Sequence, residues 1–113
     1  MTKKFSLDAT AREQLERARR ESGRSAVTLV GGHEQVLRQT VIALTAGTGL
    51  QEHVTAGEAT LQVLKGRVRL TAGDDNWEGR TGDLLIVPGG PHSLSATEDA
   101  AVVLTVARPA GPR

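Results

Sequence analysis

The sequence predicts an all-β protein of antiparallel strands, folded as a sandwich or barrel, with one amphipathic α-helix at the N-terminus. Short β-type runs divided by glycine fill the chain from residue 25 onward. Turn signals such as Gly31-Gly32 and Gly73-Asp74 separate these runs. Because no helical pattern lies between the runs, a parallel α/β sheet is disfavoured.

The N-terminal helix is predicted over residues 7–21. Ser6 or Asp8 can cap its start, and Gly23 can end it. Its apolar side chains recur at three- and four-residue intervals and form a narrow stripe on a charged helix: Leu7, Ala11, Leu15 and Ala18. We therefore expect this helix to lie against a larger surface.

The β-type runs lie at 26–32, 36–47, 59–66, 67–75, 83–90, 92–96 and 100–107. A chain of 113 residues has the common size of one domain with one core. We expect an N-terminal helical segment (1–24), a β-barrel (25–108) and a frayed C-terminal tail (109–113).

Composition excludes several classes of function. Cysteine is absent, which excludes disulfides, thiolate metal sites and a cysteine nucleophile. Phe5 and Trp77 are the only aromatic residues and the net charge is +1, so we expect no nucleic-acid partner. Neither a secretory signal nor an apolar run of roughly 20 residues is found, so we expect a cytoplasmic protein with no membrane partner.

Two stretches of the chain then resemble the paired motifs of the cupin family. The first cupin motif is written G(x)5HxH(x)3-4E(x)6G, and Gly47, His53 and Gly66 fall in its register. The second is written G(x)5PxG(x)2H(x)3N, and its counterparts here are Gly82, Pro88, Gly90 and His92. The resemblance covers roughly residues 45–96 and implies a jelly-roll β-barrel.

The same alignment shows where the chain departs from the motifs. Thr55 stands where the first motif has its second histidine, and Ala59 stands where it has glutamate, with Glu58 one residue early. In the second motif His92 arrives one residue early, and the later position holds no asparagine. The resemblance therefore predicts the fold more firmly than it predicts the chemistry.

The expected site is a pocket around two histidines. Regular alternation along a strand places Gln51, His53 and Thr55 on one face. With His92 and with Gln39 of the run 36–47, they form the predicted ligand pocket. The cupin resemblance adds a second interpretation, in which His53 and His92 bind a divalent transition metal (Zn, Mn, Fe, Ni or Cu) and Glu58 completes the site.

The remaining conspicuous residues are expected to be structural. His33 is predicted in a surface loop. Trp77 is predicted to cap the sheet or to contact a second subunit. The arginines near the helix end alternate with glutamates and are expected on a solvated face.

Three functions stay open from the sequence. The first is a barrel that binds a small molecule without strong catalysis. The second is a metal-dependent enzyme of the oxygenase or isomerase type, using His53 and His92. The third is a structural or regulatory partner protein whose barrel is a scaffold. Family habit, the helix stripe and the open sheet edges predict a homodimer.

Overall fold

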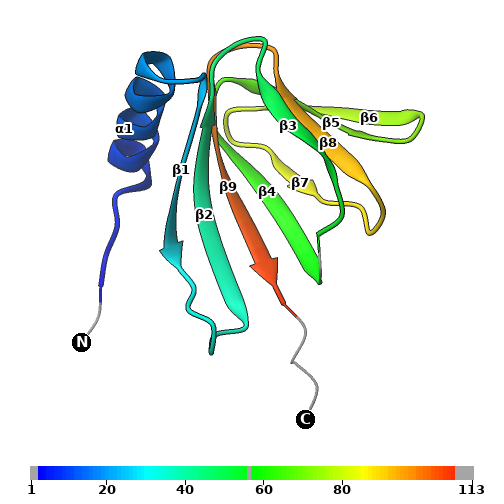
Figure 1. Ribbon diagram of the computed structural model, residues 1–113, viewed down its shortest axis with the longest axis horizontal. Coiled ribbons are helices and arrows are strands. Elements are labelled where there is room, and N and C mark those ends of the chain that lie inside the picture. The colour runs from blue at the N-terminus through cyan, green and yellow to red at the C-terminus, as the bar shows by residue number, and fades with distance from the viewer. Residues whose placement is uncertain (1–2, 56, 109–113) are drawn as a thin grey trace.

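The computed structural model describes residues 3–55 and 57–108, in which two antiparallel sheets face each other and one helix flanks them (Figure 1). The predicted all-β fold with one N-terminal helix is confirmed. The predicted tail, 109–113, lies outside the described residues. The elements are α1 (Leu7–Arg20), β1 (Arg24–Val30), β2 (Leu37–Leu44), β3 (Gly49–His53), β4 (Glu58–Lys65), β5 (Arg67–Ala72), β6 (Asp75–Arg80), β7 (Leu84–Ile86), β8 (His92–Ala96) and β9 (Ala100–Ala107).

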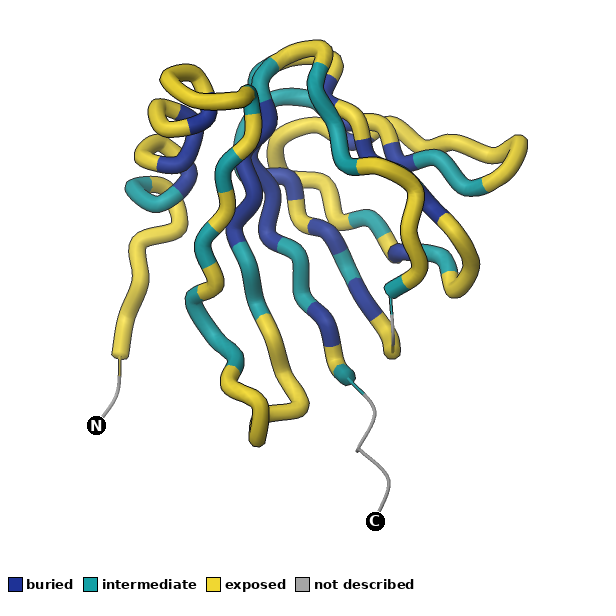
Figure 2. Tube along the Cα trace, in the orientation of Figure 1, coloured by how far each residue is buried: buried dark blue, intermediate teal, exposed yellow. Residues whose placement is uncertain are grey.

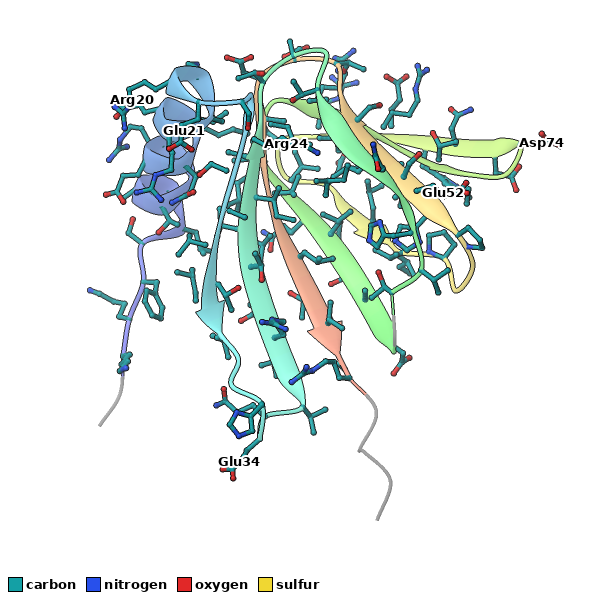
Figure 3. The ribbon with its side chains drawn as sticks, viewed as in Figure 1. Arg20, Glu21, Arg24, Glu34, Glu52 and Asp74 are labelled. Atoms are coloured by element: carbon teal, nitrogen blue, oxygen red, sulfur yellow. The ribbon has the colours of Figure 1, made fainter. Side chains whose placement is uncertain are left out.

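The larger sheet has the order β1-β2-β9-β4-β7, and the smaller sheet has the order β3-β8-β5-β6. All the pairings are antiparallel. Strand β6 was not among the predicted runs, because its side chains are mostly polar and exposed. It forms by hairpin pairing with β5 across a turn at Gly73-Asp74, and Figure 3 shows Asp74 at the tip of that hairpin.

The core lies between the two sheets, as the distribution of buried residues shows (Figure 2). It is built from alternate residues of the strands, the pattern that period-two side chains produce when one face is covered. Its members are mostly aliphatic and include Ile42, Leu44, Leu61, Val63, Val68, Leu70, Leu94 and Val102.

Helix α1 covers part of the outer face of the larger sheet. Ser6 accepts a hydrogen bond from the backbone N–H of Ala9 at the helix start. The buried stripe packs against Ala43 of β2 and Ala101 of β9, and consists of Ala11, Leu15 and Ala18. The helix is 14 residues long, and no helix among the described residues is long and apolar enough to cross a membrane.

The stripe differs from the prediction at two residues. Leu7 is 37% exposed at the first turn, while Gln14 is buried. Gln14 can be buried because its side-chain oxygen accepts a hydrogen bond from Ser25 of β1. The helix is thus bound to its own sheet by both apolar and polar contacts.

Gly66 carries the chain from the larger sheet into the smaller one. It lies between β4 and β5 with a φ of +79°, a conformation that glycine adopts without strain. A Cβ atom at this position would lie 2.0 Å from the backbone oxygen of Asp99. Both the conformation and the close approach therefore require glycine.

Asp99, between β8 and β9, links three segments at one end of the molecule. Its carboxylate accepts hydrogen bonds from the Ala46 backbone N–H at 2.8 Å and from Arg19 of α1 at 2.9 Å. These bonds, the backbone one foremost, hold the pKa of the Asp99 carboxyl below its usual range. The carboxylate thereby ties the helix to the β2–β3 turn.

Candidate functional site

His53 and His92 lie side by side on neighbouring strands. They are direct partners in the β3–β8 pairing, with ring centroids 4.6 Å apart and ring planes 58° apart. Residues opposite each other on adjacent strands project their side chains to the same face. The two motifs that are 39 residues apart in the chain (92 − 53) thus meet at one point of the smaller sheet.

A bulge in β3 sets the direction of His53. Leu50 pairs with Leu94 and His53 pairs with His92, so that one strand advances three residues while the other advances two. Leu50 and His53 consequently line the same interior cavity, and Gln51 and Glu52 between them are exposed. The structure differs here from the regular alternation expected from the sequence, because the extra residue shifts the phase of the strand.

Both ring nitrogens of the buried His92 have hydrogen-bond partners. Nδ1 lies 2.9 Å from the carbonyl oxygen of Gly90, and Nε2 lies 3.2 Å from the hydroxyl of Thr55. A carbonyl oxygen only accepts, so Nδ1 carries a proton and Nε2 of the neutral ring accepts from Thr55. The Thr55 hydroxyl thereby occupies one ring nitrogen of a histidine that the cupin resemblance assigns to a metal.

His53 is exposed and is held at one ring nitrogen. Its Nδ1 lies 3.0 Å from the backbone oxygen of Gln51, which again places the proton on Nδ1. Within the described part of the chain, Nε2 of His53 has no hydrogen-bond partner among the side chains. Nε2 of His53 is therefore the ring nitrogen of the site that can accept a hydrogen bond from a ligand.

The space beside the two imidazoles is small and apolar. Its volume is about 30 Å³, enough for one water molecule or a group of that size. Apart from the two histidines and Thr55, the lining consists of aliphatic side chains: Ile42, Leu50, Leu61, Leu70, Val87, Leu94 and Leu104. Ligand pockets for whole small molecules have volumes of about 300–1,000 Å³. The interior therefore accepts one small group, and the rest of any ligand has to lie across the mouth beside His53.

The donor set at this point falls short of a three-ligand metal centre. Glu58, at the start of β4, is exposed, and its inward neighbour is Ala59 of the core. Among residues 3–55 and 57–108, no group of three or more His, Asp or Glu side chains could hold a metal ion. Two imidazoles with no carboxylate do not fit the usual arrangement of three protein ligands at a catalytic metal.

The structure brings together three of the predicted pocket residues: His53, Thr55 and His92. Gln51 contributes only its backbone oxygen. Gln39 lies on the face of β2 that also bears Val41 and Ala43, and its amide donates to Thr105 of β9 at 3.1 Å. This is the outer face of the larger sheet, since Ala43 packs against the helix there.

His33 is exposed in the loop between β1 and β2, as predicted. Trp77 of β6 pairs with Leu70 of β5 and is 44% exposed. It lines a hollow together with apolar residues of β7.

The aliphatic lining of the imidazole cavity was not predicted as part of the site, because apolar strand residues carry no signal that separates a cavity wall from ordinary core.

The sequence model of the family described as "Cupin domain" matches residues 40–108. No curated protein matches this chain.

Among solved structures, the conserved protein SPY1581 of unknown function from Streptococcus pyogenes is 29% identical, with a TM-score of 0.71 over 80% of each chain. A cupin superfamily protein from Desulfitobacterium hafniense has a TM-score of 0.78 at 14% identity, covering 96% of this chain and 94% of its own. Salicylate 1,2-dioxygenase from Pseudaminobacter salicylatoxidans has a TM-score of 0.75 at 20% identity, covering 93% of this chain. This chain spans 34% of the dioxygenase chain.

Proposed function

This chain belongs to the cupin family, and on that basis we propose that it binds a small molecule at the mouth of the barrel, beside His53 and His92, without strong catalysis. The observation that supports this proposal is the arrangement of the two imidazoles. His53 offers an accessible Nε2 next to the buried and fully hydrogen-bonded His92. Such a convergent polar pair above an apolar interior is typical of ligand sites.

The geometry favours a ligand that carries a small hydrogen-bond donor. A hydroxyl group can donate to Nε2 of the neutral His53 ring. The cavity of about 30 Å³ admits one such group, and the ligand body then packs over the rim. Strong catalysis is disfavoured, because the groups around the cavity are aliphatic apart from Thr55 and the two imidazoles.

Gentisate is a suitable first probe, because salicylate 1,2-dioxygenase has been crystallised with it and it carries two hydroxyl groups. We expect gentisate or phenol at millimolar concentration to shift the ring signals of His53 and His92 in ¹H–¹³C NMR spectra. His53→Ala should abolish saturable binding, while His33→Ala, in a distant loop, should leave it unchanged. Ring signals that respond to neither probe would count against the proposal.

A metal-dependent enzyme of the oxygenase or isomerase type is the second candidate. It is favoured by the distance of 4.6 Å between the ring centroids, at which both imidazoles would reach one ion once Thr55 releases Nε2 of His92, since metal–nitrogen bonds are about 2.0–2.1 Å long. The test is metal analysis of protein purified without a histidine tag. Near-stoichiometric Zn, Mn, Fe, Ni or Cu that is lost in both His53→Ala and His92→Ala would favour this enzyme. A folded protein that binds neither metal nor small molecules would favour the scaffold interpretation.

The homodimer and the cytoplasmic location stay proposals. The helix stripe no longer supports a dimer, because it is buried against the same chain. The remaining support is the exposed apolar surface where the edge strands β6 and β7 approach each other, at Trp77 and Leu84. The absence of cysteine suits a reducing compartment.

A further inference from the structure

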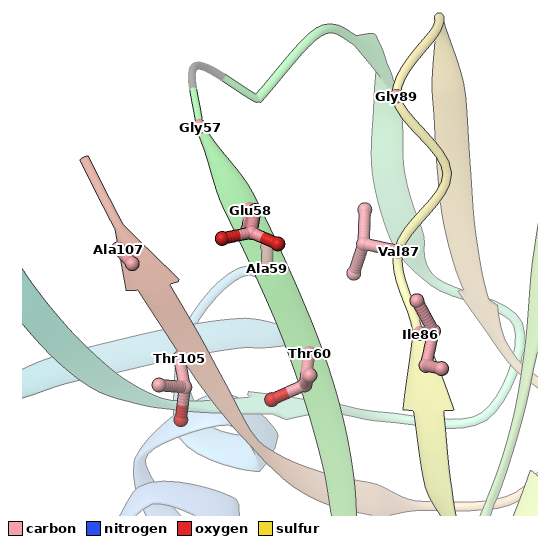
Figure 4. A pocket seen from close by; sticks show the side chains of 9 residues that line it. All are labelled: Gly57, Glu58, Ala59, Thr60, Ile86, Val87, Gly89, Thr105 and Ala107. Atoms are coloured by element: carbon pink, nitrogen blue, oxygen red, sulfur yellow. The ribbon is translucent and has the colours of Figure 1, made fainter. Parts of the chain in front are cut away.

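A second hollow of ligand size lies at the rim of the larger sheet, apart from the imidazole cavity (Figure 4). It has a volume of about 540 Å³, within the range of small-molecule sites. It is formed where β4 begins, where β9 ends, and by β7 with the loop that follows it. The two hollows share one residue, Val87, so they are neighbours with different linings.

The strand register explains the lining of this rim groove. Thr60 of β4 pairs with Thr105 of β9 on one side and with Ile86 of β7 on the other, while Glu58 pairs with Ala107. Since residues opposite each other share a face, these five side chains form two adjacent rows across the strands on the outer face. One row runs from Thr105 through Thr60 to the apolar Ile86, and the other consists of Ala107 and the carboxylate of Glu58.

The charge in the groove is a single carboxylate. Glu58 is exposed, and no ion pair between described residues includes it. Arg108 directly follows the last residue of β9, but its guanidinium donates to the backbone oxygens of Gly32 and Gln35 and not to Glu58. The groove thus presents an acceptor that the described chain leaves without a cationic partner.

The hydroxyl groups add further acceptors. Thr105 already accepts from the Gln39 amide at 3.1 Å, which orients its oxygen within the groove wall. Thr60 stands beside it, next to Glu58 in the same strand face (Figure 4). A carboxylate with adjacent hydroxyl oxygens matches the several N–H donors of an alkylammonium group, and charge-assisted hydrogen bonds of this kind are the stronger ones.

We propose that the rim groove is a binding site for a small aliphatic amine, whose ammonium group binds Glu58 and Thr60 and whose alkyl chain packs on Ile86. The charge of Glu58 disfavours carboxylate ligands, since it would repel them. This site does not depend on the imidazole pair. Its ligand class also differs from that proposed for the barrel mouth.

The test uses three probes of equal length on the full chain: hexylamine, hexanol and hexanoate, titrated at low ionic strength in ¹H–¹⁵N NMR experiments. We expect hexylamine to shift the backbone amides of Glu58, Thr60, Ile86 and Thr105 in a saturable manner, and to bind more tightly than hexanol. Hexanoate should leave these amides unchanged. The preference for the amine should weaken as salt is added, because the carboxylate is exposed.

Glu58→Gln keeps the shape of the side chain and removes its charge, and should weaken hexylamine binding by up to about fivefold, the upper end of the range for an exposed ion pair. Glu52→Gln, an exposed carboxylate on β3, is the matched control and should have no effect. Equal binding of amine and alcohol, or an unchanged affinity in Glu58→Gln, would overturn the proposal. Shifts at the histidine rings report on the other site, so failure of one proposal is distinguishable from failure of the other.

Discussion

The hydroxyl of Thr55 lies 3.2 Å from Nε2 of His92, at the position where the cupin motif has its second histidine. Where the motif has a histidine, this chain has a hydrogen-bond partner of the buried imidazole. His92 is 4% exposed, so its ring depends on protein partners for its hydrogen bonds.

Replacing Thr55 with valine should destabilise the protein. The change keeps the side-chain shape but leaves Nε2 of His92 buried without its partner, at a cost of about 1–2 kcal/mol in the free energy of unfolding. Urea unfolding measures this quantity. The matched control is Thr28→Val, because the hydrogen bond between Thr28 and Thr40 is exposed and should contribute less than about 0.5 kcal/mol. Equal losses in the two variants would contradict the role given to Thr55.

Replacing Thr55 with histidine should restore metal affinity. The variant adds a third imidazole beside His53 and His92, where the original chain has a hydroxyl that binds metals poorly. We expect Ni²⁺ or Zn²⁺ to bind at least about tenfold more tightly than to the original protein, as measured by calorimetry. The gain should disappear when His53→Ala is added. An unchanged affinity would show that the two existing imidazoles cannot converge on an ion.

Gly66→Ala should destabilise the fold strongly. The alanine would be forced into the left-handed backbone conformation of Gly66, and its Cβ would lie 2.0 Å from the backbone oxygen of Asp99, so we expect a loss of at least about 3 kcal/mol. Gly73→Ala separates the two effects, because Gly73 has a φ of +60° but nothing within 4 Å of the added atom. That control should lose about 1–2 kcal/mol, the conformational part alone. Similar losses in both variants would mean that the close approach at Gly66 relaxes easily.

Asp99 should make stability depend on acid pH. Its pKa is lower in the folded protein than in the unfolded chain, so its contribution is present above the unfolded pKa, near 4, and is lost as the pH falls through the folded pKa. The side chain is 38% exposed, which limits the contribution at neutral pH to about 0.5–1 kcal/mol.

The measurement is urea unfolding of Asp99→Asn and the original protein at neutral pH and near pH 3. The difference between the two proteins should shrink at the lower pH. Asp74→Asn, at the exposed hairpin tip, is the control and should show no such change. A difference that is equal at both pH values would contradict the role of the Asp99 carboxylate.

Leu84→Lys should disrupt the proposed homodimer. Leu84 is 63% exposed on the edge strand β7, where a lysine places a charge in any apolar contact between subunits. Light scattering coupled to size exclusion should show a dimer for the original protein and a monomer for the variant. Val54→Lys changes a residue of similar exposure, 61%, which directly follows β3 on the edge of the smaller sheet opposite β6, and should leave the dimer intact. If the original protein is a monomer in this measurement, the proposed homodimer is wrong.

Much of the fold could be predicted from residues that act locally. The runs of alternating apolar residues became strands, and the glycines at 66, 73 and 82 occupy turns with positive φ. Strand β6 escaped prediction because its residues are mostly exposed and polar, and only pairing with β5 makes them a strand. The buried Gln14 escaped for a similar reason, since its partner Ser25 belongs to another element.

The candidate site shows the same division. The sequence by itself determined that the chain is a cupin whose motif lacks two of its usual ligands, because motif spacing and residue identity are properties of the chain. Only the tertiary structure decided what surrounds the remaining histidines. The bulge between Leu50 and His53 turns His53 toward His92, and aliphatic side chains from both sheets leave a cavity of only about 30 Å³ beside them. Register and cavity size depend on contacts between distant strands, so they follow from packing and cannot be read from local sequence.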